Sequence, residues 1–226
     1  MIDNQKVGAV IVAAGSGERM GGVDKMLAPL GGQMVLARVV GVFQECSAID
    51  EIAVVLGEHN IEAGQRLLED FSKVVAVCRG GERRQDSVLA GINQLGGCRW
   101  LVIHDGARPL LTVDLITSGL AAAAESGAAA CAVPATDTIK LAGDDDYVRE
   151  TLSRKRLWAV QTPQVFRSDI ITAAYRQAQA EFTDDAALVE RAGYRVKLYK
   201  GSYGNIKITT PAHLALAGVL LGERGG

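Results

Sequence analysis

The sequence predicts a three-layer, doubly wound α/β fold with a mostly parallel central sheet. Short runs of Val, Ile, Leu and Ala alternate with longer stretches of helical periodicity along most of the chain. The short runs lack polar alternation, as expected for strands that are buried on both faces. With 226 residues, of which 48% are hydrophobic, the chain fits one large domain over residues 1–226.

The predicted elements follow one another in a regular order. Apolar runs predict strands at Gly8–Ala13, Glu51–Leu56, Lys73–Cys78, Trp100–His104 and Ala128–Val133. Helical patterns lie between them at Met34–Cys46, Ile61–Phe71, Arg84–Leu95 and Val113–Glu125. The chain then returns with helices at Ser168–Gln179 and Asp184–Ala192, a strand at Arg195–Tyr199 and a last helix at Pro211–Leu221. Because such sheets bind ligands over the carboxyl ends of their strands, we expect functional residues just after strands.

Residues 136–160 depart from this rhythm. Two polar, alternating segments flank the acidic turn Gly143–Asp146, a pattern that predicts a hairpin. The segment has few apolar residues with which to form a core of its own, so we expect it to project as an arm. A partner subunit and bulk solvent are equally compatible with its exposed face.

Charge and composition exclude several classes of protein. A formal charge of −2 and a pI of about 6.0 provide no basic field for nucleic acid. The longest run of small residues, Leu120–Pro134, is too short and too polar for a membrane span, and the amino terminus lacks the pattern of a signal peptide. Four widely spaced cysteines indicate reduced thiols in the cytoplasm, and the three histidines lack metal-ligand spacing.

A glycine-rich turn follows the first predicted strand. Residues 13–17 read Ala-Ala-Gly-Ser-Gly, and the cations Arg19 and Lys25 follow soon after. Such a turn exposes backbone N–H groups that bind phosphate. Met20 stands where a dinucleotide fingerprint needs its third glycine, and the Gly-Lys-Ser/Thr ending of a P-loop does not occur between residues 15 and 25. The turn therefore indicates another kind of polyphosphate site, or else an ordinary connection with glycines at positive φ.

Three further segments after predicted strands have polar residues. Asp105, which follows the fourth strand, suits Mg²⁺ in company with substrate phosphates, or it caps the next turn. Gly80-Gly81 leads into a helix with Ser87, where the segment can contact a base or serve as a plain turn. Late in the chain, Arg154–Arg156 and Lys207 offer positive charge to a second anion or to solvent.

Five motifs occur in order over nearly the whole chain: Ala13–Gly21, Lys25, His104–Pro109, Thr162–Gln164 and Asn205–Thr209. With these motifs the chain resembles the 2-C-methyl-D-erythritol 4-phosphate cytidylyltransferases of the non-mevalonate isoprenoid pathway. The opening loop by itself matches the wider sugar-nucleotidyltransferase superfamily, whose fold is Rossmann-like. The ribitol-phosphate cytidylyltransferases are close relatives, so D-ribitol 5-phosphate remains an alternative acceptor.

The resemblance implies a Mg²⁺-dependent transfer of CMP from CTP to the acceptor phosphate, with release of pyrophosphate. It implies catalytic cations at Arg19, Lys25 and Lys207, and a homodimer through the arm at 136–160, in which the neighbouring subunit contributes to each pocket. It implies substrate contacts at Ala13, Ala14, Gly15, Ser16, Gly17, Gly81, Glu82, Ser87, Asp105, Ala107, Arg108, Thr138, Arg154, Thr162 and Thr183, with Asp105 also near the metal.

Two residues depart from the family pattern. Met26 stands where glutamine is usual, and Gly204 stands where an acidic residue is common. Without an acid at 204, Mg²⁺ would rely on Asp105 and the phosphates, which this ion accepts because it keeps water ligands readily. A non-catalytic nucleotide-binding module of the same fold is a further alternative, although the charged residues present at Arg19, Lys25, Asp105 and Lys207 argue against it.

Overall fold

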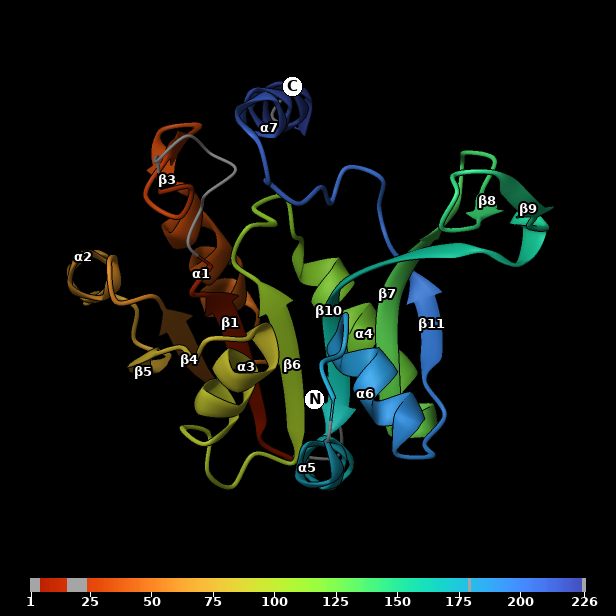
Figure 1. The fold of residues 1–226 in the computed structure, drawn as a ribbon. Coiled ribbons are helices and arrows are strands. Elements are labelled where there is room, and N and C mark those ends of the chain that lie inside the picture. Colours follow the sequence, from red (N-terminus) through yellow and green to blue (C-terminus); the bar gives the residue numbers. More distant parts are fainter. Residues whose placement is uncertain (1–4, 16–23, 179, 225–226) are drawn as a thin grey trace.

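A seven-stranded sheet forms the centre of the protein. The computed structural model describes residues 5–15, 24–178 and 180–224. The strands of the sheet are β1 (Val7–Ala13), β4 (Glu51–Leu56), β5 (Val74–Arg79), β6 (Trp100–Asp105), β7 (Ala128–Pro134), β10 (Trp158–Arg167) and β11 (Lys197–Lys200). They lie in the order β11-β7-β10-β6-β1-β4-β5 (Figure 1). All neighbours pair in parallel except β10, which is antiparallel to both β6 and β7, so the predicted mostly parallel sheet is confirmed.

Helices cover both faces of this sheet, as predicted (Figure 1). One face packs against α1 (Val35–Glu45), α2 (Ile61–Leu67) and α4 (Val113–Ser126), and the other against α3 (Arg84–Ile92), α5 (Ser168–Gln177) and α6 (Asp185–Arg191). Side chains of β1 alternate between the two layers: Ala9 and Ile11 enter the first core, and Val10 enters the second. The helix α7 (Pro211–Arg224) packs near the short hairpin of β2 (Pro29–Leu30) and β3 (Gln33–Met34), beside the carboxyl edge of the sheet.

Local sequence signals set several helix ends. The α4 helix begins after Thr112, whose side chain accepts a hydrogen bond from Leu115 N, and ends at Gly127, whose φ of 81° favours glycine. The α6 helix begins after Asp184, whose carboxylate accepts a bond from Ala187 N at 2.9 Å. The helices α2 and α3 end earlier than predicted, at Leu67 and Ile92.

The strand β10 was not predicted. Its centre is the polar segment Gln161–Gln164, which contains a proline, and both features disfavour a buried strand. The proline and the polar residues lie where the pairing of β10 with β7 is irregular, because the register between the two strands shifts between Val160 and Gln164. Trp158–Val160, expected to belong to the arm, instead pair with β7 in the main sheet.

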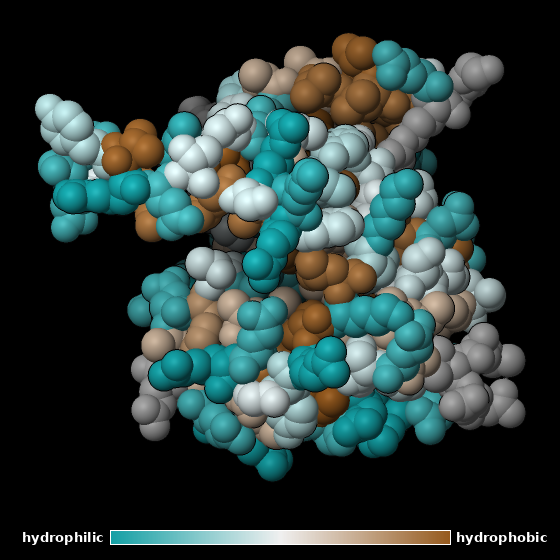
Figure 2. Space-filling model, turned by 90° about the vertical axis from the view of Figure 1, so that its right-hand side faces the viewer, coloured by the Kyte–Doolittle hydropathy of each residue, from teal (hydrophilic) through white to brown (hydrophobic). Residues whose placement is uncertain are grey.

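The remainder of residues 136–160 forms a projecting hairpin. Its strands are β8 (Lys140–Ala142) and β9 (Val148–Thr151), which pair antiparallel and are followed by a single 3₁₀ turn at Arg154–Arg156. The arm stands clear of the body at the upper left of Figure 2. Its tip exposes apolar side chains, among them Tyr147 at 75% and Val148 at 58%. Across the described ranges, no helix combines the length and apolar character needed to cross a bilayer.

Candidate active site

A pocket of about 220 Å³ lies at the carboxyl ends of β1 and β6. The separate strand-end segments of the sequence meet here, as expected for a doubly wound sheet. The pocket is lined by Val12, Ala13, Ala14, Gly15, Lys25, Met26, Gly81, Glu82, Arg83, Arg84, Ser87, Asp105, Ala107 and Lys207. Ten of the predicted catalytic and substrate-contact residues are therefore brought together, and Met26 lies among them. The predicted residues Ser16, Gly17 and Arg19 lie outside the described residues.

A larger hollow of about 830 Å³ lies along α1, beside the β2–β3 hairpin and residues 109–111. Its lining includes Met34, Phe71 and Leu221, and none of the predicted site residues. Size alone therefore does not mark the functional site; the concentration of strand-end polar groups does.

The turn after β5 is held close to the end of β1. A Cβ atom on Gly80 would lie 2.5 Å from both Ala14 Cβ and Ser87 Oγ, so only glycine fits this approach. The N–H of Gly81 donates to Ser87 Oγ at 3.2 Å, although Ser87 belongs to α3. Backbone groups and a short hydroxyl thus form a rigid wall on this side of the pocket.

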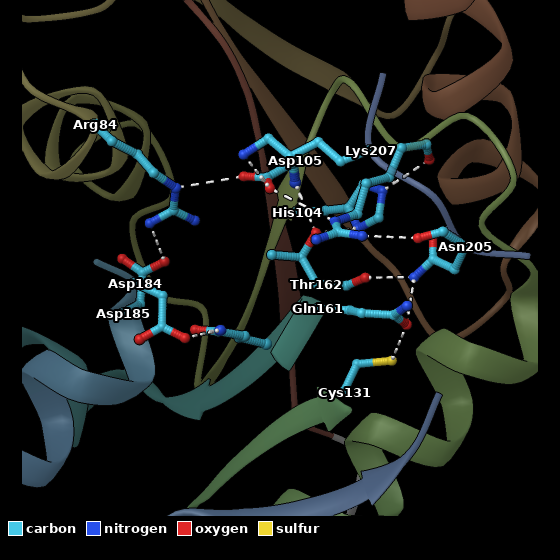
Figure 3. Close-up of polar contacts among 12 residues, drawn as sticks. Arg84, His104, Asp105, Cys131, Gln161, Thr162, Asp184, Asp185, Asn205 and Lys207 are labelled. Carbon is cyan, nitrogen blue, oxygen red and sulfur yellow. Dashed lines mark hydrogen bonds and ion pairs between the residues drawn. The ribbon is translucent and has the colours of Figure 1, made fainter. Parts of the chain in front are cut away.

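Asp105 lies among three cations at the end of β6 (Figure 3). Lys207 Nζ is 2.8 Å from Asp105 Oδ2, and Arg84 Nε is 3.3 Å from Oδ1. Arg108 Nε is 3.6 Å from Oδ2. Lys207 comes from the loop before α7 and Arg84 from the start of α3, so the cluster joins distant parts of the chain. The surplus of positive charge suits a polyanion.

These charges determine which groups are ionised. Burial alone would raise the pKa of the Asp105 carboxyl, but the charges of Lys207 and Arg84 outweigh it and hold the pKa well below its usual range. Burial opposes the charge of Arg84 as well, yet Asp185 and Asp105 raise the pKa of its guanidinium. Burial lowers the pKa of the His104 imidazole to about 4, so this ring is neutral at pH 7.

Arg84 also connects the pocket to the start of α6. Its Nη1 lies 2.7 Å from Oδ2 of Asp185, whose Oδ1 accepts a hydrogen bond of 2.6 Å from the Tyr175 hydroxyl. Asp185 is 1% exposed. The sequence did not predict a role for Arg84 or Asp185, because a charged residue at the start of a helix is normally solvated.

A second layer of polar groups lies beneath Asp105 (Figure 3). The Asp105 N–H donates to Thr162 Oγ1 at 3.0 Å, and Thr162 Oγ1 lies 3.1 Å from His104 Nδ1. Arg108 Nη1 donates to the carbonyl of Asn205 at 2.7 Å, while Asn205 Nδ2 donates to the carbonyl of Thr162 at 2.8 Å. The predicted residues Arg108 and Thr162 are therefore next to Asp105. The contact between His104 and Thr162 was not predicted, although His104 belongs to the His104–Pro109 motif.

Three other predicted residues do not line this pocket. Thr138 and Arg154 lie on the arm, where Arg154 Nη1 donates to the Thr136 carbonyl at 2.6 Å. Thr183 is exposed immediately before α6. Within one chain, the structure thus joins ten of the predicted site residues in the pocket but leaves these three apart.

The side chains around Asp105 offer few protein ligands to a metal ion. Within the described part of the chain, no group of three or more His, Cys, Asp and Glu side chains is arranged to hold a metal ion. A carboxylate offers about four lone pairs, and Arg84 and Lys207 occupy two of those on Asp105. One protein carboxylate with free acceptor capacity fits an ion that takes its other ligands from phosphates and water.

Comparisons with known proteins agree with this arrangement. Residues 7–223 match the family model described as 2-C-methyl-D-erythritol 4-phosphate cytidylyltransferase. Enzymes of that name from Dehalococcoides mccartyi and Symbiobacterium thermophilum are 52% and 47% identical, over 98% and 96% of this chain and 98% and 93% of their own lengths. The crystal structure of 4-diphosphocytidyl-2C-methyl-D-erythritol synthase from Anaerococcus prevotii superposes with a TM-score of 0.88 at 31% identity, covering 98% of each chain.

Proposed function

The chain belongs to the 2-C-methyl-D-erythritol 4-phosphate cytidylyltransferase family, and from this premise we propose that the pocket at Asp105 transfers CMP from CTP to 2-C-methyl-D-erythritol 4-phosphate. The observation that supports this most strongly is the meeting of the β1 turn, Lys25, Asp105 and Lys207 in one pocket. A phosphate oxygen of the acceptor attacks the α-phosphorus of CTP, the bond to the β-phosphate breaks, and pyrophosphate leaves. The product is 4-diphosphocytidyl-2-C-methyl-D-erythritol.

The roles in the nucleotide half of the site come from the family resemblance, and the pocket lining supports them for Ala13, Ala14, Gly15, Lys25, Gly81, Glu82, Ser87, Ala107 and Lys207. Backbone N–H groups at Ala13–Gly17 hold the triphosphate, and the wall formed by Gly81, Glu82 and Ser87 contacts cytosine. Ala107 faces the ribose. Arg19, Lys25 and Lys207 neutralise charge that develops at the reacting phosphorus, which is the main work of a protein in phosphoryl-type transfer.

The acceptor half uses Arg108, Thr138, Arg154 and Thr183 for the second anion. Arg108 lies beside Asp105, at the point where the two substrates must meet. Thr162 belongs to this set by resemblance, but its hydroxyl already contacts Asp105 N and His104 Nδ1. No side chain has to act as a nucleophile, so positioning of two polyanions is the central task.

We propose magnesium as the metal, because one carboxylate with free acceptor capacity suits an ion that takes its other ligands from phosphates and water. Asp105 would hold it, together with phosphate oxygens and water. Bound there, the ion supplies charge neutralisation on the triphosphate and on the leaving pyrophosphate. Removal of divalent ions with EDTA should abolish turnover and leave the thermal unfolding of the ligand-free protein unchanged.

We further propose a homodimer in which the arm completes the neighbouring pocket. Its exposed apolar side chains, such as Leu141 and Tyr147, support association, and Thr138 and Arg154 lie on the same arm. Four free cysteines, three of them buried, support a reducing compartment such as the cytoplasm.

Product analysis tests the proposed reaction. Incubation of the protein with CTP, Mg²⁺ and 2-C-methyl-D-erythritol 4-phosphate should yield two coupled ³¹P doublets of a diphosphate diester, together with pyrophosphate. Recovery of unchanged CTP after prolonged incubation would contradict the proposal.

A further inference from the structure

The Thr162 hydroxyl and the His104 ring together lie between two backbone groups, one of which can only donate a hydrogen bond and the other only accept one. The backbone N–H of Asp105 is 3.0 Å from Thr162 Oγ1 and can only donate. On the other side of His104, Nε2 is 3.2 Å from the carbonyl oxygen of Arg108, which can only accept. His104 Nε2 therefore bears a hydrogen.

The tautomer of His104 then determines the direction of the remaining bond. His104 is completely buried, and its ring lies 5.6 Å from that of Phe43, so it is a neutral imidazole with a single N–H. With that hydrogen on Nε2, Nδ1 must accept. Thr162 Oγ1, at 3.1 Å, donates its only proton to Nδ1. The four groups form a one-way chain from Asp105 N–H through Thr162 and His104 to the Arg108 carbonyl.

This chain occupies the place where backbone pairing between β6 and β10 stops. The ladder ends at the pair Gln164 and Ile103, so the Asp105 N–H meets a side-chain hydroxyl instead of a strand carbonyl. The Thr162 carbonyl is used separately, by Asn205 Nδ2. One end of the chain thus holds the backbone of Asp105, and the other holds that of Arg108.

We propose that His104 and Thr162 are positioning residues that fix Asp105 and Arg108, and that the Thr162 hydroxyl does not donate to the acceptor phosphate. The inference rests on the proposed function for its kinetic readout. A donor whose proton is committed to a buried nitrogen cannot serve a phosphate without losing that bond. Small displacements of reacting groups are costly in rate, so the chain should affect kcat more than acceptor affinity.

Steady-state kinetics separate the two roles of Thr162. Thr162→Val and His104→Phe should each lower kcat roughly 10- to 100-fold with little change in KM for the acceptor. The double variant should be no slower than the slower single variant, because the chain acts as one unit. Thr162→Ser, which keeps the hydroxyl, should recover most of the loss. Thr117→Val, on the exposed side of α4, is the matched control and should retain full activity.

Direct phosphate binding predicts a different pattern. Thr162→Val would then raise the acceptor KM, His104→Phe would not, and the two effects would multiply in the double variant. That pattern would overturn the proposal, as would equal losses in Thr162→Ser and Thr162→Val.

A spectroscopic measurement on the unmodified protein does not depend on the folding of any variant. In ¹⁵N-histidine-labelled protein, the His104 signals, assigned by their through-space contacts with the Phe43 ring, should show a protonated Nε2 and a bare, hydrogen-bonded Nδ1. Addition of the acceptor phosphate should leave both unchanged. Protonation at Nδ1, or loss of its hydrogen bond when the acceptor binds, would refute the chain. Absence of product with wild-type protein would refute the proposed function while leaving this measurement valid.

Discussion

Lys207 Nζ lies 2.8 Å from Asp105 Oδ2, so a loop near the end of the chain contacts the carboxyl end of a central strand. The contact joins a cation of the late Asn-Ile-Lys segment to the carboxylate of the last residue of β6. It sets one border of the pocket, and the β1 turn with Lys25 sets another. Both lysines therefore face the space in which we expect the triphosphate.

Removal of the Lys207 charge should impair catalysis and spare the fold. Lys207→Ala should lower kcat about 10²- to 10³-fold, as expected for loss of a group that stabilises transition-state charge. Steady-state pyrophosphate release measures this effect. The matched control is Lys197→Ala, which removes a surface lysine paired with Glu125. Similar losses in both variants would show that Lys207 has no special role.

Lys25→Ala should cause a loss of similar size, because Lys25 lines the same pocket. Its circular dichroism spectrum and unfolding midpoint should match those of the wild type. Turnover near the wild-type rate would rule out a catalytic role for Lys25.

Arg19→Lys should also lower turnover, since the point charge of a lysine does not replace the planar guanidinium of arginine at a phosphate.

The buried pair of Arg84 and Asp185 should matter for stability as well as for the site. Arg84→Met leaves the buried Asp185 carboxylate without its cation, and should cost about 3 kcal/mol in the free energy of unfolding. Urea denaturation measures this cost. The control Arg83→Met breaks an exposed pair with Asp86 and should cost less than about 1 kcal/mol. Equal costs for the two variants would contradict the structural role of the buried pair.

Two buried thiols should resist alkylation. Burial raises the pKa of both Cys98 and Cys131 to about 11, so at pH 8 only about one thiol in a thousand is a reactive thiolate. Iodoacetamide should label both far more slowly in native than in urea-denatured protein, as followed by peptide mass mapping. The reaction should accelerate as the pH approaches 11. Rapid labelling of either thiol at pH 8 in the folded protein would show that its site is more open than described.

Subunit complementation tests the proposed role of the arm. Lys207→Ala removes a pocket cation and Arg154→Ala removes an arm cation, so each homodimer should be nearly inactive. Mixing and re-equilibrating the two should restore about a quarter of wild-type activity, because half the dimers then have one intact site. An inactive mixture, despite verified subunit exchange, would mean that the arm serves the pocket of its own chain.

Sequence patterns predicted the fold well because the burial of strands and the periodicity of helices leave a local pattern of apolar residues. Buried strands such as β1 and β6 are continuous apolar runs, and Asp184 is recognisable as a helix cap. The strand β10 has neither a continuous apolar run nor a cap residue to identify it, because its centre is polar. Tertiary contacts satisfy that polar centre, such as the hydrogen bond from Asn205 to the Thr162 carbonyl. Such contacts depend on tertiary structure and leave no local pattern.

The site was predicted only in part, because some of its residues have a local sequence pattern and others depend on tertiary contacts. Glycine spacing and strand-end positions identified the β1 turn and Asp105 from local sequence. The role of Arg84 became visible only when α3 and α6 were adjacent, since Asp185 lies far away in the chain. The link from His104 to Thr162 likewise depends on the pairing of β6 with β10.

Pyrophosphate release from CTP with each acceptor in turn tests the central claim most directly. In the presence of Mg²⁺, 2-C-methyl-D-erythritol 4-phosphate should support rapid release, while D-ribitol 5-phosphate and a blank without acceptor should support little. Release with ribitol phosphate instead would contradict the acceptor assignment. Release with neither acceptor would contradict the catalytic assignment of the Asp105 pocket.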